Sequence, residues 1–289
     1  MSQLDFKLDP GLKLGPVCLR VNDLELMLSF YEKECGLKVI QRDGNFTALA
    51  CGQSKEPLLI LDHDEKALRP PADAAGLYHY ALLVPDRKSL AAAYLSLGNN
   101  GIVFDGYADH NVSEALYLSD PESNGIEIYA DRPRNNWQFD EGEVQMATQP
   151  LDLESLIKEL PKEDKDKLTG LVEGTRVGHV HLKVTELQTS IIFYRNLLGL
   201  ELTRYLGSAA FLSVGGYHHH IGMNTWESLG GPRAQKSWLG LEYFVLKIPQ
   251  VNLNELTSRL SGSMSTESDG PGRVFVSDPD EIKLVFSAL

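Results

Sequence analysis

The chain repeats itself, and this repeat limits the possible folds more than any other feature of the sequence. The segment VNDLELMLSFYEKECGLKVI at 21–40 aligns without gaps with VTELQTSIIFYRNLLGLELT at 184–203. The identical pairs include Val21/Val184, Phe30/Phe193, Tyr31/Tyr194, Gly36/Gly199 and Leu37/Leu200. Further along, Asp120-Pro121 is echoed by Asp278-Pro279. Because such repeats reflect repeated structural units, we expect the two halves of the chain to share one architecture.

Each half divides again into two similar modules. A β-like run is followed by a capping residue and by apolar residues at helical spacing, as in PVCLRVNDLELMLSFYEKECGL and HYALLVPDRKSLAAAYLSLGNNGI. Short β-like runs separated by Gly, Asn or Asp-Pro turns come next. The sequence therefore predicts an α+β fold of four β-α-β-β-β modules at about 14–63, 76–131, 176–226 and 238–289. We predict two domains, 1–131 and 176–289, joined by a linker at 132–175 with a short helix at 151–160.

Composition narrows the class of protein and the kind of partner. Lys and Arg number 27 and Asp and Glu 40, which gives a net charge of −13. Such a chain repels nucleic acid and anionic membranes, so we expect neither as a partner. No run of 18 apolar residues and no signal-like N-terminus occur, and the three cysteines form no C-x-x-C pair. We therefore expect a cytoplasmic protein with buried thiols.

Side-chain alternation in the expected strands places four polar residues on the strand faces that the helices do not cover. In GHVHLKV the residues Val180 and Leu182 suit the helix-covered face, so His179 points the other way. The same alternation turns His79 in LYHYALLV and Glu127 in GIEIYA away from the helices. In HHHIGMN it turns His220 away as well, opposite to Ile221 and Met223. These four residues are candidates for a polar site.

The candidate ligands are concentrated in the second and third modules. His79 and His179 occupy the same place in their modules, where the first and fourth modules carry Pro16 and Tyr243. Glu127 lies in the last strand of the second module, and the fourth module has Lys283 there. Two imidazoles and one carboxylate are the facial triad of non-haem Fe(II) sites, although Mn(II) and other divalent metals accept the same ligands. The alternative is a polar cleft that binds no metal.

Four stretches of the sequence carry a resemblance to a known family: GHVHLKVTELQTSIIFYRNLLGL, GLYHYALLVPDRKSL, DHNVSEALYLSDPESNGIEIYADRPRNNW and GGYHHHIGMN. Over nearly its whole length the chain resembles the vicinal oxygen chelate superfamily (glyoxalase, bleomycin resistance protein and extradiol dioxygenase), and within it the bacterial catechol 2,3-dioxygenases of type I. The resemblance implies modules paired into cupped mixed β-sheets around a metal. It also implies that His79, Glu127 and His179 are the metal ligands and that Tyr117 is the active-site tyrosine.

Two further residues are candidates for proton transfer. One of the three histidines at 218–220 resembles the family's other active-site histidine, and strand alternation favours His220. His110 is the histidine upstream of Tyr117, but its spacing matches the family only with a gap. In GGYHHHIGMN we expect the last strand of the third module, with His220 facing the metal as a ligand or an acid–base group and His219 facing the helices. The alternative for this stretch is a turn with solvated imidazoles. In the better-known relatives the ligands come from the third and fourth modules, so here the site must form between the second and third.

The function that the resemblance implies is cleavage of an aromatic ring. We predict a non-haem Fe(II)-dependent extradiol dioxygenase, an oxidoreductase that opens catechol or a substituted catechol or hydroquinone with O2. A metal-dependent isomerase or lyase of the glyoxalase type and a metal-free binding protein of the drug-resistance type are the alternatives. A homodimer is expected from the sheet edges. Five aromatic residues are candidate pocket walls, although aromatic residues in strands more often lie in the core: Tyr78, Tyr80, Tyr129, Trp226 and Trp238.

Overall fold

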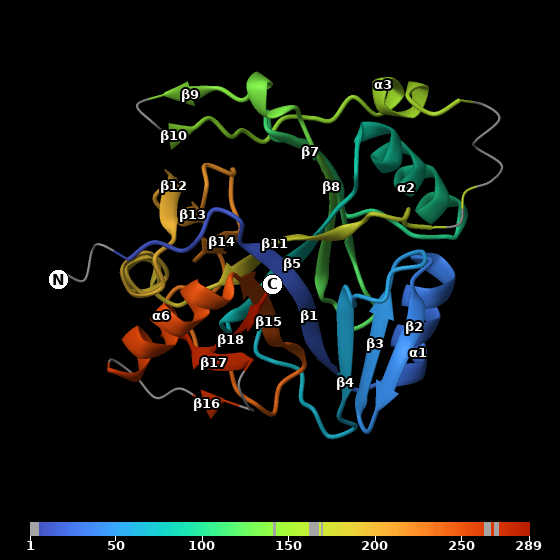
Figure 1. Cartoon of the computed structure of the whole chain (residues 1–289). Coiled ribbons are helices and arrows are strands. Elements are labelled where there is room, and N and C mark those ends of the chain that lie inside the picture. The colour runs from blue at the N-terminus through green and yellow to red at the C-terminus, as the bar shows by residue number, and fades with distance from the viewer. Residues whose placement is uncertain (1–5, 141–142, 162–167, 169, 263–266, 269–271) are drawn as a thin grey trace. The chain divides into compact units, whose positions relative to one another are not determined.

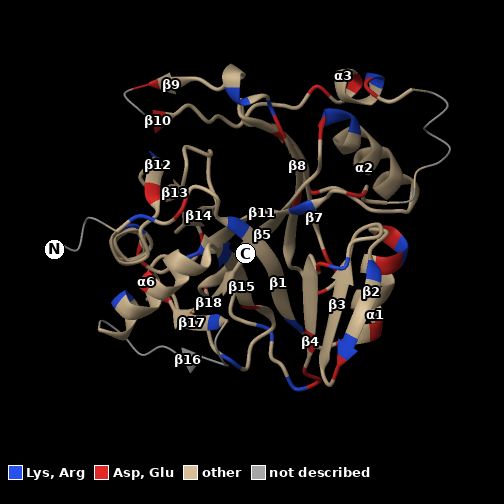
Figure 2. Ribbon diagram, viewed as in Figure 1, with Lys and Arg blue, Asp and Glu red and all other residues tan. Residues whose placement is uncertain are grey.

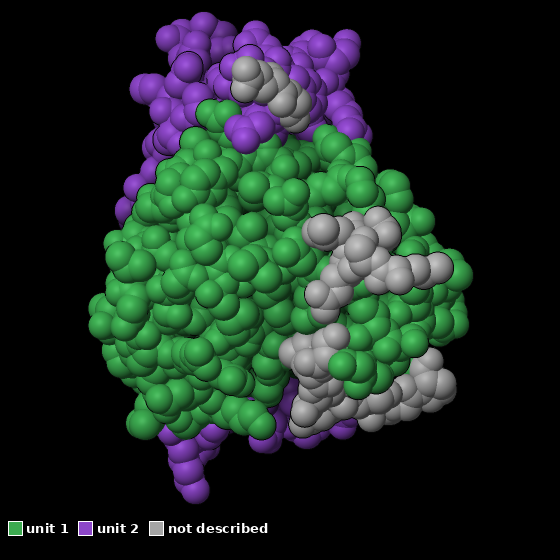
Figure 3. All heavy atoms as spheres, turned by 90° about the vertical axis from the view of Figure 1, so that its left-hand side faces the viewer, with its two compact units in different colours: residues 1–19, 67–78, 179–289 green, residues 20–66, 79–178 purple. Residues whose placement is uncertain are grey.

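The computed structural model describes residues 6–140, 143–161, 168, 170–262, 267–268 and 272–289 (Figure 1). The chain forms two compact units, which Figure 3 distinguishes by colour. Unit 1 contains residues 1–19, 67–78 and 179–289, and unit 2 contains residues 20–66 and 79–178. The division of the sequence into the domains 1–131 and 176–289 with a linker between them stays a prediction.

Each predicted module is present as one strand, a helix and further strands. The first consists of β1 (Lys13–Val21), α1 (Leu24–Ser29) with a π-helical turn (Phe30–Glu34), β2 (Lys38–Asp43), β3 (Phe46–Ala50) and β4 (Leu59–His63). The second consists of β5 (Gly76–Leu83), α2 (Arg87–Asn99), β6 (Gly106–Asp109), β7 (Ser113–Ser119) and β8 (Gly125–Asp131). The helices begin where the capping residues predict, because the Asp23 and Asp86 side chains accept from the backbone N–H groups of Leu26 and Ser89.

The third and fourth modules repeat this order. The third consists of β11 (Arg176–Lys183), α5 (Leu187–Ile191) with a π-helical turn (Ile192–Leu197), β12 (Glu201–Tyr205), β13 (Ala209–Ser213) and β14 (Ile221–Asn224). The fourth consists of β15 (Gly240–Ile248), α6 (Gln250–Ser261), β16 (Glu267–Ser268), β17 (Arg273–Ser277) and β18 (Lys283–Ala288).

The strands form two large mixed sheets and one small hairpin. One sheet has the strand order β16-β17-β18-β15-β1-β4-β3-β2 and the other β12-β13-β14-β11-β5-β8-β7-β6. The first and last strands pair in parallel in the second, third and fourth modules, as β5 with β8, and the following hairpins are antiparallel. Modules one and four thus share one sheet, and modules two and three share the other. The predicted α+β fold of paired β-α-β-β-β modules is confirmed.

Between the second and third modules the chain forms a short 3-10 turn (Arg134–Asn136), the hairpin strands β9 (Phe139–Asp140) and β10 (Glu143–Val144), and helix α3 (Leu153–Lys158). The Asp152 side chain caps α3 by accepting from the Ser155 backbone N–H. Arg87 at the start of α2 donates to the Ser155 carbonyl at 3.3 Å and to the Glu159 carboxylate at 2.7 Å. These bonds attach the connecting segment to the second module within unit 2.

Charged groups of both signs are interspersed along the elements (Figure 2). Over the described part of the chain, no helix combines the length and the apolar character that a membrane crossing requires.

A buried tyrosine–aspartate pair recurs at equivalent places in the repeat. In unit 2 the Tyr31 hydroxyl donates to Asp120 at 2.8 Å, and in unit 1 the Tyr194 hydroxyl donates to Asp278 at 3.0 Å. Both aspartates also accept backbone N–H groups of their own Asp-Pro turns. Each pair therefore joins the helical segment of one module to the turn before a last strand.

Burial changes the acidity of these aspartates. Loss of solvation raises the pKa of the Asp278 carboxyl to about 7, although hydrogen bonds from Ile282 and Tyr194 oppose the shift. The same cause raises the pKa of Asp120 to about 6. The folded chain therefore binds these protons more tightly than the unfolded chain, so their contribution favours folding at low pH and is lost as the pH rises.

We predict that Asp278→Asn removes part of this pH dependence. Asn keeps an oxygen for the two backbone N–H groups and can donate to the Tyr194 hydroxyl, but it cannot ionise. Between about pH 4 and pH 7, the unfolding free energy of the variant should rise relative to that of the original chain, by at most about 1.4 kcal/mol per pH unit. Urea unfolding across this range measures the difference. A difference that is constant with pH contradicts the prediction.

Candidate functional site

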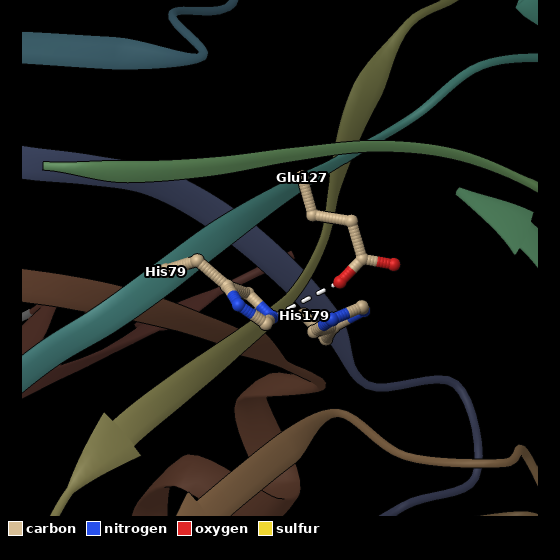
Figure 4. A group of neighbouring side chains, drawn as sticks. All are labelled: His79, Glu127 and His179. Carbon is tan, nitrogen blue, oxygen red and sulfur yellow. Dashed lines mark ion pairs between the residues drawn. The ribbon is translucent and has the colours of Figure 1, made fainter. Parts of the chain in front are cut away.

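The register of β5 and β8 brings an imidazole and a carboxylate together. These strands pair in parallel with Ala81 opposite Glu127, and His79 lies two residues before Ala81 on the same face. The His79 Nε2 atom is 3.0 Å from the Glu127 Oε2 atom (Figure 4). Both side chains are buried, with 6% of His79 and 3% of Glu127 exposed. A buried carboxylate needs a compensating charge, which a protonated histidine or a cation supplies.

His179 on β11 completes a group of three possible metal ligands. One ligand atom each of His79, Glu127 and His179 lies within 4.8 Å of the other two, and all three residues are buried. Figure 4 shows the two rings and the carboxylate directed toward one common point. Two imidazole nitrogens and one carboxylate oxygen form a donor set that suits Fe(II), Mn(II) and other divalent metals. The residues present therefore fit a divalent cation.

Close packing at the residue before His179 fixes the backbone of β11. Tyr129 is fully buried and shares the face of β8 with Glu127, two residues away. Ala81 and Ala115 on the neighbouring strands leave room for its ring. A Cβ atom at Gly178 would lie 2.0 Å from the Tyr129 hydroxyl oxygen, which is shorter than any real contact. Only glycine therefore fits at position 178.

Tyr117 and His110 form a hydrogen-bonded pair beside the three-residue group. Tyr117 on β7 is the cross-strand partner of Glu127, and its ring centroid lies 5.7 Å from that of His79. The Tyr117 hydroxyl is 2.6 Å from His110 Nε2, and His110 Nδ1 is 2.7 Å from the Ala147 carbonyl oxygen. Because a carbonyl only accepts, Nδ1 carries the proton and Nε2 accepts from Tyr117. The irregular spacing of His110 in the sequence thus does not separate it from Tyr117.

The three consecutive histidines do not belong to a strand, so this part of the sequence prediction is wrong. Gly215 and Gly216 have φ angles of +60° and +67°, which form a turn, and β14 begins only at Ile221. Strand alternation therefore does not apply to His218 or His219. The His220 backbone N–H donates to the Leu212 carbonyl at 2.8 Å and its carbonyl accepts from Val180, as at the end of a strand. The alternative of solvated imidazoles is also wrong, because all three histidines are at most 9% exposed.

His219 lies against His179, rather than facing the helices as predicted. The two ring centroids are 4.1 Å apart. His218 Nδ1 and His219 Nδ1 are 2.8 Å apart, and His220 Nδ1 is 2.8 Å from the Ser213 hydroxyl. The role predicted for His220 stays a prediction. His219 is the residue that sequence reasoning missed, and the double glycine that precedes the histidines was the available signal.

Known proteins resemble this chain in sequence and in fold. The profile of the Glyoxalase/Bleomycin resistance protein/Dioxygenase superfamily matches residues 13–128 and 176–247. Over 271 residues the chain is 40% identical to catechol-2,3-dioxygenase of Bacillus subtilis (strain 168), which covers 92% of this chain and 93% of that protein. It is 26% identical over 136 residues to biphenyl-2,3-diol 1,2-dioxygenase 3 of Rhodococcus globerulus, which covers 45% of this chain and 71% of that protein.

Among solved structures, glyoxalase I from Zea mays is similar to this chain with a TM-score of 0.56. The alignment covers 96% of this chain and 92% of the maize chain, at 16% sequence identity. At this identity the likeness concerns the fold alone.

We predict that Gly178→Ala destabilises the protein by about 1–3 kcal/mol, because the added methyl group overlaps the Tyr129 hydroxyl and the strand must shift. Denaturant unfolding measures the loss. Gly98→Ala is the matched control, since Gly98 lies in α2 with no atom within 4 Å of an added Cβ. The control should be neutral or slightly stabilising. Equal effects of the two substitutions would show that the contact with Tyr129 is not tight.

Proposed function

Because the chain belongs to the glyoxalase/bleomycin resistance protein/dioxygenase superfamily, we propose that it is an Fe(II)-dependent extradiol dioxygenase that opens the ring of catechol or a substituted catechol with O2. The observation that carries the proposal is the buried group of two imidazoles and one carboxylate in a chain that is 40% identical to a catechol-2,3-dioxygenase. That relative supports dioxygenase activity and a divalent metal. The proposal adds two more specific statements, that the metal is Fe(II) and that the substrate is a catechol.

His79, Glu127 and His179 are proposed to hold the metal. When bound there, Fe(II) would supply Lewis acidity toward the hydroxyl groups of the diol and the electrons for reaction with O2. Glu127 contributes a negative charge that favours a cation at this buried point, and the two histidines contribute neutral donors. The low exposure of all three side chains keeps bulk water away from the same point.

Tyr117 and His110 are proposed to move a proton during the reaction. The Ala147 carbonyl holds the proton of His110 on Nδ1, which keeps Nε2 ready to accept the hydroxyl proton of Tyr117. Tyr117 can then take a proton from a hydroxyl group of the substrate, so the pair passes one proton away from the diol. His220 is proposed as a second acid–base group, with its Nδ1 atom held by Ser213.

The proposal also covers the cellular compartment, the oligomeric state and the partners of the enzyme. We propose a cytoplasmic homodimer, whose partners are a small aromatic diol and O2 rather than nucleic acid or a membrane. The three cysteines, which are buried and form no disulfide with one another, agree with a reducing compartment. The end strands of the two large sheets, such as β6 and β12, offer edges for association.

The first prediction on the proposed function concerns the reaction itself. Protein prepared without oxygen and reloaded with Fe(II) should consume about one O2 per catechol and form a yellow ring-opened product. An oxygen electrode and absorption spectra follow the two quantities, and reloading with Mn(II) compares the metals. Protein whose bound metal is confirmed but which consumes no O2 would instead support an isomerase or lyase of the glyoxalase type.

The second prediction concerns the carboxylate. Glu127→Ala should lower the affinity for Fe(II) by more than about 100-fold, because it removes the charged donor of the group. Metal analysis after dialysis measures this loss without reference to activity. Glu201→Ala is the control, since Glu201 is an exposed carboxylate paired with Lys7. If the Glu127 variant keeps its iron and its turnover, Glu127 is not a ligand.

The third prediction concerns the proton path. Tyr117→Phe should lower kcat roughly 100-fold, because the ring remains but the hydroxyl that donates to His110 is lost. The bound metal should be unchanged, which separates proton transfer from metal binding. A variant with the original kcat would exclude Tyr117 from the path.

A further inference from the structure

Four rings form a continuous cluster in unit 1, which we call the aromatic cluster: Tyr78, His181, Phe211 and Trp226. The His181 ring centroid lies 5.2 Å from that of Tyr78 and 5.7 Å from those of Phe211 and Trp226. Tyr78 and Trp226 contact each other edge to face at 5.2 Å. Of the five aromatic residues that the sequence offered as pocket walls, Tyr80 and Tyr129 lie in the core instead.

The imidazole at the centre of this cluster is held on several sides. Asn224 accepts the Trp226 backbone N–H through its side-chain oxygen at 3.1 Å, so its amide nitrogen donates to His181 Nε2 at 3.0 Å. A Cβ atom at Gly222 would lie 2.9 Å from the His181 ring, so the ring packs directly on the backbone of β14. His181 and Asn224 are both buried. Their arrangement gives the outer rings a rigid base.

The aromatic cluster is continuous with the proposed metal site. His181 follows His179 by two residues on the same face of β11, which corresponds to about 6.6 Å along the strand. Phe211 contacts His181 on one side and His219 on the other, where the ring centroids are 5.0 Å apart. His219 in turn lies on His179. A row of rings therefore leads from the candidate ligand His179 to the aromatic cluster.

The outer members of the cluster are exposed although they are held in place. Trp226 is 53% exposed and Tyr78 36% exposed. The Trp226 indole N–H donates to the Ser208 hydroxyl at 3.1 Å, which fixes the orientation of its ring. A fixed and exposed indole is a typical anchor for an apolar ligand group, because little side-chain freedom is lost when it binds.

Charge near the cluster favours a neutral ligand group. Lys183 is the next residue on this face of β11, and its ammonium group lies 3.2 Å from the Ala72 carbonyl oxygen and 3.7 Å from the Glu227 carboxylate. The protein itself thus compensates this positive charge. A planar uncharged group fits the surrounding rings better than an anion.

We propose that the aromatic cluster is the part of the substrate site that receives an apolar ring substituent, so that the enzyme prefers aryl-substituted catechols to catechol. This inference rests on the proposed dioxygenase function and adds Trp226 and Tyr78 as residues that determine specificity. The diol would lie at the group of His79, Glu127 and His179, and the second ring would extend along the row of rings toward Trp226.

The experiment measures binding separately from turnover. Fe(II)-loaded protein is titrated without oxygen with 3-phenylcatechol and with catechol, and calorimetry gives the two affinities. We expect tighter binding of 3-phenylcatechol, and we expect Trp226→Ala to lower the ratio of the two affinities roughly three- to tenfold. Trp226→Leu, which keeps apolar bulk, should lower it less. Phe46→Ala is the control, because Phe46 is 43% exposed on β3 and is not part of the cluster.

Each outcome bears on the inference. If catechol is bound and cleaved but 3-phenylcatechol has no advantage, or if Trp226→Ala leaves the ratio unchanged, the aromatic cluster is not the substituent site and the dioxygenase function stands. If neither diol binds and no O2 is consumed, both the function and the inference fail. Thermal unfolding of each variant verifies that the comparison is made on folded protein.

Discussion

A carboxylate buried in the middle of a sheet is the constraint on which this site depends. Glu127 is 3% exposed, and its charge must be balanced within a few ångströms. The parallel register of β5 and β8 provides one neighbour, His79, and the antiparallel register of β7 and β8 provides another, Tyr117. If either register slipped by one residue, the carboxylate would be moved to the helix-covered face. The hydrogen bonds of the sheet thus determine the chemistry of the site.

The two halves of the repeat keep one buried contact, while the modules differ in the residues that could bind a metal. The tyrosine–aspartate pair occurs as Tyr31–Asp120 and again as Tyr194–Asp278, so the repeat preserves this buried contact. At the position of Glu127 the fourth module has Val285, because Val285 lies opposite Val245 in β15 and β18 as Glu127 lies opposite Ala81 in β5 and β8. Lys283, the residue expected there from the sequence, lies two residues earlier and forms an ion pair with Glu242. A valine side chain has no donor atom for a metal. Among the described residues of the sheet formed by the first and fourth modules, no group of three possible metal ligands occurs.

Strand alternation and the repeat are enough to predict the fold and to select His79, Glu127 and His179 as a group. The reasoning works for these three residues because all of them lie within regular strands, where side chains alternate strictly. It fails at His219, because the left-handed turn at Gly215 and Gly216 delays the start of β14. The partner of His110 could not be foreseen either, since a carbonyl group 37 residues away carries no side-chain signal.

The bond between His110 and the Ala147 carbonyl has an evolutionary consequence. The repeat suggests that each module could be exchanged as a unit. The tautomer of His110 in the second module, however, is fixed by the Ala147 carbonyl, which lies outside every module. The connecting segment also pairs with the second module through mutual hydrogen bonds between Asp109 and Gln149. A chimaera that joined the second module to the connecting segment of another protein would keep the strands of the module. It would lose the carbonyl that holds the His110 proton on Nδ1. Recombination at the module boundaries is therefore constrained by a segment that the duplication did not copy.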